Sequence, residues 1–143
     1  MTWNAAPTHI SVTDRGGVLA RRRDHGSASI QLVVLMPALF SVMFLGMQGA
    51  LFYHARTVAM AAAQEGARTA AGLTGTGPAG AQDAYSFIAD AGGADVLEAP
   101  QITSSRSAIT ATVTVTGVSL SVIPGWSPIV SQSASVPVER ITQ

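Results

Sequence analysis

Residues that could carry out catalysis or hold a metal are few and widely scattered. The three histidines, His9, His25 and His54, do not have the spacing of metal ligands. No serine lies in a G-x-S-x-G motif, and the absence of cysteine excludes disulfides and thiolate metal sites. The carboxylates of the C-terminal part are isolated and expected to be solvated: Asp83, Asp90, Asp95, Glu98 and Glu139. No general acid–base pair is indicated, so we expect no catalytic residue, no metal site, no cofactor and no enzyme.

Composition narrows the possible partners. The chain has 143 residues and a formal net charge of zero, enough for one small domain and a membrane anchor. Arginine supplies all eight basic side chains. Without a basic excess, nucleic acid is not an expected partner. The glycine-rich segment 72–80 contains no lysine and follows no predicted strand, so nucleotide binding is not expected. We also expect no small-molecule substrate.

A long apolar segment, Ile30 to Tyr53, contains no charged residue and no histidine. As a helix it would be about 36 Å long, against a hydrocarbon core of about 30 Å. Its apolar residues occupy every helical face, which indicates a membrane span and not a buried core helix. Three arginines at 21–23 precede it and only Arg56 follows closely, which predicts a cytoplasmic N-terminus. We therefore expect a single-pass protein of the cytoplasmic (inner) membrane, with 27–54 spanning it and the C-terminal part outside.

The junction before this segment resembles the prepilin-peptidase site of type IV-like pilins. A basic run is followed by Gly26, four small or apolar residues, Gln31 and the apolar helix. The resemblance implies cleavage between Gly26 and Ser27, at a glycine where another backbone can approach closely. Residues 1–26 would then be a cytoplasmic leader that is removed.

Within that group, the chain resembles the TadE/TadG-like minor pseudopilins of the tight-adherence (Flp) pilus apparatus. Pro37 stands eleven residues after Gly26, as in the family, and ARTVAMAAAQEGARTAA at 55–71 matches its alanine-rich segment. The resemblance implies a pilin-like α+β fold and a role in pilus assembly or a related secretion apparatus. It also implies the partners: prepilin peptidase, other pilins and the assembly platform in the inner membrane.

Six residues of the anchor are candidates for contacts between subunits: Gln31, Pro37, Gly46, Gln48, Gly49 and Ala50. Gln31 stands where the family usually has glutamate, so it can accept a hydrogen bond from a neighbouring subunit but brings no charge. Pro37 is expected to kink or loosen the helix. Gly46 and Ala50 form a small-xxx-small pair beside Gly49, and Gln48 can hydrogen-bond to a partner helix.

Beyond the membrane, the alanine-rich segment 55–72 predicts that the same helix continues. The residues Ala55, Ala59, Ala63, Gly66 and Ala70 form one smooth face, and Glu65 can pair with Arg68. Gly72 is expected to end the helix, and 73–80 to form a flexible linker.

Residues 81–143 predict a small α+β domain with a short helix over 81–91 and about three antiparallel strands. A strand opens at Ile102 and a turn covers 104–107. Strict Thr/apolar alternation predicts a strand over 108–118, with a bulge at Gly117 where the pattern changes phase. Trp126 is expected to fold back onto the sheet, and the alternative is a contact with a partner or with the membrane surface. Pro137 restricts the strand over 129–141 to an edge strand or a strand end.

Two other hypotheses remain beside the minor pseudopilin. One is an unprocessed, single-pass envelope protein with an outward-facing interaction domain. The other is a secreted protein cut after a signal-peptide site such as Ala59-Met60-Ala61. The apolar segment exceeds the length of about 7–15 residues of a signal-peptide core, which disfavours secretion.

Overall fold

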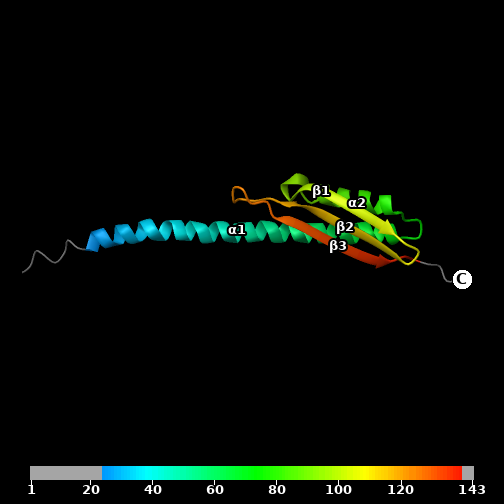
Figure 1. Cartoon of the computed structure of the whole chain (residues 1–143), viewed down its shortest axis with the longest axis horizontal. Helices are drawn as coiled ribbons and strands as arrows, with labels where there is room; N and C mark the ends of the chain where they lie inside the picture. Colours follow the sequence, from blue (N-terminus) through cyan, green and yellow to red (C-terminus); the bar gives the residue numbers. More distant parts are fainter. Residues whose placement is uncertain (1–23, 140–143) are drawn as a thin grey trace, which may run out of the picture. The chain divides into compact units, whose positions relative to one another are not determined.

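The computed structural model describes residues 24–139, with side chains from residue 30 onward, so the leader residues 1–23 and the end of the predicted last strand lie outside the described part. The elements are α1 Asp24–Ala71, α2 Gly77–Asp90, η1 Gly93–Asp95, β1 Leu97–Arg106, β2 Thr110–Ser119 and β3 Ile129–Pro137 (Figure 1). This confirms the predicted α+β architecture, with a long first helix, a second helix and a three-stranded antiparallel sheet. The chain divides into two compact units, Met1–Phe40 and Ser41–Gln143.

In the first unit, the described chain is the beginning of α1. The helix continues through Pro37, whose ring lies inside it. Every side chain from Ile30 to Phe40 is exposed.

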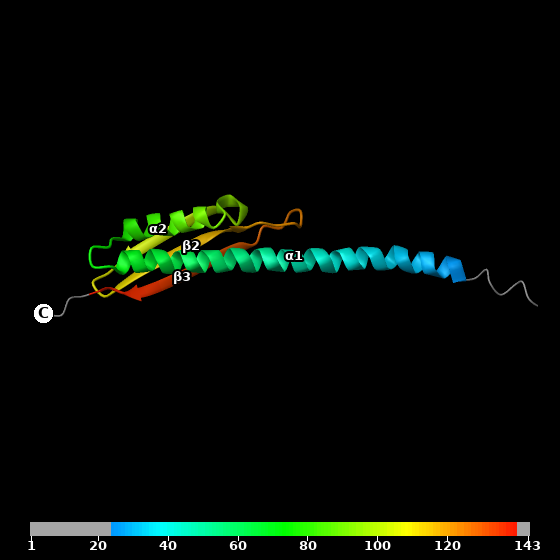
Figure 2. The ribbon, with the colours of Figure 1, turned by 180° about the vertical axis from the view of Figure 1, so that it is seen from behind.

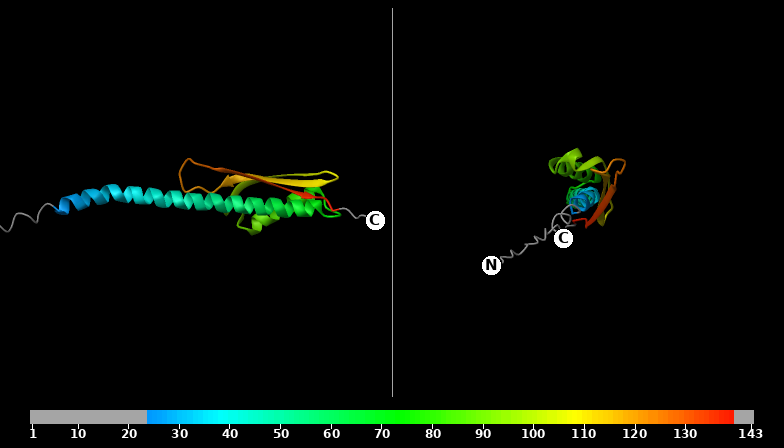
Figure 3. Two further views of the ribbon diagram at one scale, coloured as in Figure 1. Left: turned by 90° about the horizontal axis from the view of Figure 1, so that it is seen from below. Right: turned by 90° about the vertical axis from the view of Figure 1, so that its left-hand side faces the viewer.

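The second unit is a sheet with both helices on one of its faces. The strand order is β1-β2-β3, so β3 is an edge strand, as predicted (Figure 2). It ends at Pro137, before the predicted end at residue 141. The core joins the alanine-rich part of α1 with Ile88 of α2 and with Val113 and Val115 of β2. Figure 3 shows α2 and this part of α1 on the same side of the strands. The opposite face carries the threonines of β2.

The predicted small-residue face of α1 is confirmed as buried. Ala55, Ala59, Ala63 and Ala70 are completely buried, and Gly66 lies against α2. A Cβ added to Gly66 would collide with the carbonyl oxygen of Gly80 and lie 2.9 Å from the Cβ of Ala84. The two helices therefore cross with their backbones in close approach, which only glycine allows at this point.

The bulge predicted at Gly117 is wrong. The register between β2 and β3 runs without interruption through Thr116, Gly117 and Val118. Gly117 is needed for space, because a Cβ there would lie 2.6 Å from Cγ of Leu97. The irregularity of the sheet is in β1, where the register shifts between Glu98 and Gln101.

Three predicted boundaries also differ from the structure. Helix α2 begins at Gly77 instead of Ala81, because Thr76 caps it, accepting a hydrogen bond from the N–H of Ala79 at 3.2 Å, and Pro78 suits its first turn. Strand β1 begins at Leu97, before the predicted Ile102. It continues to Arg106, so the predicted turn over 104–107 lies later, at 107–109.

Arg106 explains why the predicted flexible linker is held in place. Its guanidinium donates to the carbonyl oxygens of Ala70 at 2.7 Å, Gly72 at 3.0 Å and Gly75. These carbonyls belong to the end of α1 and the turn that follows, where a positive charge is favourable. One strand residue therefore fixes the connection between the two helices.

Candidate membrane anchor and contact surfaces

The anchor is recognisable by apolar side chains that nothing in the described part of the chain covers. Large apolar residues from Ile30 to Met47 are between 43% and 72% exposed, and they point to all sides of α1. In water, so large an apolar surface would be unstable; in a bilayer it meets lipid. Within the described part of the chain, α1 is the one helix that is long and apolar enough to cross a membrane. The structure therefore indicates a single-pass membrane anchor.

Gln48 interrupts this exposed surface because the β2–β3 loop covers it. Its side chain is only 2% exposed. Its Oε1 accepts from the backbone N–H of Val122 at 2.9 Å and from Oγ of Ser121 at 3.1 Å, and its Nε2 donates to the carbonyl oxygen of Leu120 at 3.3 Å. Gln48 thus makes these bonds inside its own chain, in place of the predicted bond to a partner helix.

Gly46, Gly49 and Ala50 lie next to Gln48 but remain exposed. A Cβ added to Gly46 or Gly49 would meet nothing within 4 Å. No described residue requires glycine there for space, in contrast to Gly66. These positions remain proposed contacts for a neighbouring helix.

The other sequence-predicted positions lie on the first part of α1. Gln31 and Pro37 are exposed, and Gln31 lines a shallow hollow with Ile30, Val34 and Leu35. The Gly26–Ser27 peptide bond lies in the first turn of the helix, which begins at Asp24. A peptidase would have to unwind this turn to reach the bond.

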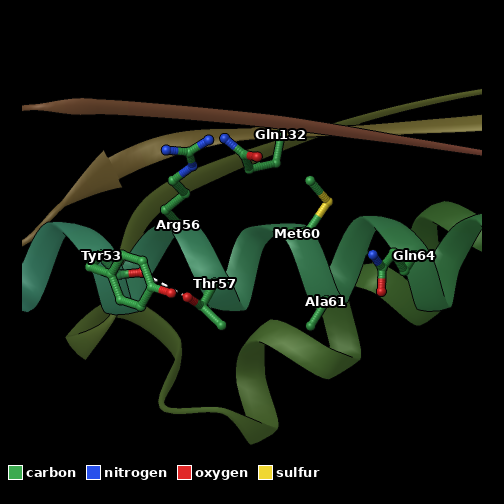
Figure 4. Close-up of a pocket in the computed structure, with 7 residues that line it drawn as sticks. All are labelled: Tyr53, Arg56, Thr57, Met60, Ala61, Gln64 and Gln132. Atoms are coloured by element: carbon green, nitrogen blue, oxygen red, sulfur yellow. Dashed lines mark hydrogen bonds between the residues drawn. The ribbon is translucent and has the colours of Figure 1, made fainter.

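A shallow hollow lies beside the part of α1 that follows Gln48. It is lined by side chains of α1 and by Gln132 of β3 (Figure 4). Arg56 and Gln132 point toward one another across it, and Thr57 donates to the carbonyl oxygen of Tyr53 at 2.9 Å. The lining contains no histidine and no carboxylate. We interpret it as surface.

The described residues contain no group of three or more histidines, cysteines, aspartates or glutamates that could hold a metal ion. The predicted pair between Glu65 and Arg68 is present at 3.3 Å on the surface of α1. The features that stand out are therefore an anchor, a tightly packed helix pair and contact surfaces.

The model of the family described as TadE-like protein matches residues 26–68. Over this segment the chain is similar to the TadE-like family. The match confirms the resemblance stated from the sequence, and it contains the whole exposed part of α1 and most of its small-residue face. No curated protein and no solved structure matches the chain.

This similarity indicates a protein related to the Tad pilus. The match ends at Arg68, before α2 and the sheet.

Two residues of the region after Arg68 carry structural roles that were not predicted from the sequence. Arg106 is the only basic residue between Arg68 and Arg140, and it lies in the inward-facing register of its strand. These two features together could have identified it as a partly buried structural cation. Gly80 gave no comparable signal, because glycine was expected in a linker.

Proposed function

We propose that this TadE-like protein is a minor pseudopilin of a tight-adherence pilus assembly or a related secretion apparatus. In this proposal, prepilin peptidase cleaves between Gly26 and Ser27, and α1 then holds the second unit outside the cytoplasmic membrane. The observation that carries the proposal is the family match, which begins at Gly26 and covers the anchor. The arginines at 21–23 support a cytoplasmic N-terminus.

The two halves of α1 would serve different contacts. From Ala55 onward the helix packs on its own sheet and on α2, so its small-residue face is occupied. The exposed part up to Ala50, apart from Gln48, is free to contact lipid and the helices of other pilins. The proposed contacts are Gln31, Pro37, Gly46, Gly49 and Ala50. Gln31 would accept a hydrogen bond from a neighbour without supplying the charge of the usual glutamate.

The proposal is tested by the N-terminus of the protein recovered from membranes. Intact-mass measurement is expected to give a chain that begins at Ser27. Replacing Gly26 with phenylalanine is expected to abolish processing, because a bulky side chain prevents close approach of the peptidase to the backbone. The matched control Gln31→Glu is expected to be processed like the wild type. Normal processing of Gly26→Phe would overturn the proposed cleavage site.

One observation favours an unprocessed envelope protein as the second candidate. The Gly26–Ser27 bond lies within α1, and a helical bond is a poor substrate until the helix opens. A mature chain that begins at Met1 or Thr2 would support this candidate. A start near Ala62 would indicate secretion, but such a cut would remove Ala55 and Ala59, which are part of the core.

A further inference from the structure

We propose that the β2–β3 loop, residues 120–128, is a second membrane contact, with Trp126 at the outer lipid interface and lipid in the groove between this loop and α1. The inference rests on α1 being a membrane anchor and not on the role in pilus assembly. It gives the second unit a fixed position at the bilayer surface.

Gln48 sets the height of the loop along the helix. The exposed apolar stretch from Ile30 to Met47 is about 27 Å long as a helix, close to the thickness of a hydrocarbon core of about 30 Å. The next residue, Gln48, is bonded to the backbone of Leu120 and Val122. Irregular backbone is not tolerated in contact with lipid tails, so the loop must lie at the boundary of the hydrocarbon core.

This height also places a second aromatic residue near the headgroups. Tyr53 is 71% exposed on α1. It follows Gln48 by about 7.5 Å of helix, which keeps it within the interfacial region. Tyrosine and tryptophan gather in this region because one end of each side chain is apolar and the other is polar.

The loop has the composition of a segment that contacts a bilayer surface. No charged residue occurs between Arg106 and Glu139. Trp126 is 49% exposed and is not part of the core, so the expectation that it folds back onto the sheet is wrong. Together with Pro128 and Ile129, it faces Leu45, Gly49 and Phe52 of α1 across a groove of about 460 Å³. The groove wall is predominantly apolar.

Away from the loop, the sheet face opposite the helices is polar, in contrast to the apolar groove. Side-chain hydroxyls pair across β2 and β3 at 2.8 Å for Thr112 and Ser135 and at 2.9 Å for Thr114 and Ser133. This part of the face is suited to water. Ile129 is 69% exposed, and it lies at the end of the sheet that carries the loop. The apolar groove is thus continuous with the lipid-facing anchor through Leu45, which favours lipid as its occupant over a helix of another subunit.

The test uses the full-length chain with Trp3→Phe, which leaves Trp126 as the only tryptophan. The protein is reconstituted in vesicles of phosphatidylcholine and phosphatidylglycerol that carry bromine at shallow or deep acyl positions. We expect blue-shifted emission, a loss of emission in bromolipid that is greater for shallow than for deep bromine, and weak quenching by acrylamide.

A matched control moves the tryptophan to the opposite end of the sheet. In a chain with Trp3→Phe, Trp126→Phe and Ile109→Trp, the tryptophan replaces a 65% exposed residue of the β1–β2 turn. We expect this control to be quenched by acrylamide and not by bromolipid.

Three outcomes would overturn the inference. Trp126 that is open to acrylamide and unaffected by bromolipid would show that the loop faces water. Trp126 shielded from both quenchers would show that protein covers the groove. A chain that fails to float with the vesicles would overturn the anchor as well, whereas the other two outcomes leave the anchor and the proposed pilus role standing.

Discussion

Replacing Gly66 with alanine is expected to lower the free energy of unfolding of the second unit by about 3 kcal/mol, near the upper end of the usual cost of overpacking. The added Cβ would collide with the carbonyl oxygen of Gly80, a backbone atom that cannot rotate away, and with Ala84 at 2.9 Å. Alanine is intrinsically the better helix former by about 1 kcal/mol, so a net loss shows that the steric clash dominates. Thermal unfolding of the full chain in detergent, followed by circular dichroism, measures the effect.

Gly46→Ala is the matched control, since it makes the same change in the same helix. A Cβ at Gly46 meets nothing within 4 Å. This variant is expected to unfold at the temperature of the wild type or slightly above it. If both variants behaved alike, the close crossing of α1 and α2 at Gly66 and Gly80 would be contradicted.

Replacing Arg106 with methionine is expected to lower the free energy of unfolding of the second unit by about 2–4 kcal/mol. Three carbonyl oxygens lose their donor together, and hydrogen bonds to a charged group contribute more than neutral ones. Methionine preserves much of the apolar stem of the side chain, so the loss of stability measures the contribution of the guanidinium group. The turn at 72–75 would also become accessible. Limited proteolysis in detergent is therefore expected to cut between α1 and α2 in Arg106→Met and not in the wild type.

Arg68→Met is the matched control, because Arg68 lies in the last turn of α1, close to the carbonyls that Arg106 binds. Arg68 pairs with Glu65 at 3.3 Å, but its side chain is 67% exposed. An exposed pair of this kind contributes about 0.2–0.5 kcal/mol. Equal destabilisation by the two substitutions would show that Arg106 does not hold the turn.

The features that were predictable from the sequence depend on neighbours in the chain. The span of α1 follows from the charge-free segment after Ile30, and the core face of β2 follows from the alternation of Thr with Val113 and Val115. The small residues of α1 indicated a packing face because alanine and glycine recur at helical spacing. The spacing of Pro37 from Gly26, together with the alanine-rich segment 55–71, carried the resemblance to the TadE-like family.

The features that were missed depend on residues far apart in the sequence. Gly117 looked like a bulge because the apolar pattern changes phase there, whereas the structure uses it to admit Leu97. Gln48 looked like a polar residue inside the membrane, because only the return of the chain after β2 brings Val122 to it. Arg106 looked like a turn residue for the same reason: the carbonyls that it binds lie more than thirty positions earlier.

We propose that α1 crosses the membrane and holds the second unit outside the cytoplasm. Because the chain has no cysteine, a single Ser133→Cys substitution on the exposed face of β3 can be labelled selectively. A membrane-impermeant maleimide applied to intact spheroplasts is expected to label this variant fully, with no increase after lysis. Labelling that appears only after lysis, or a protein recovered in the soluble fraction, would contradict the account.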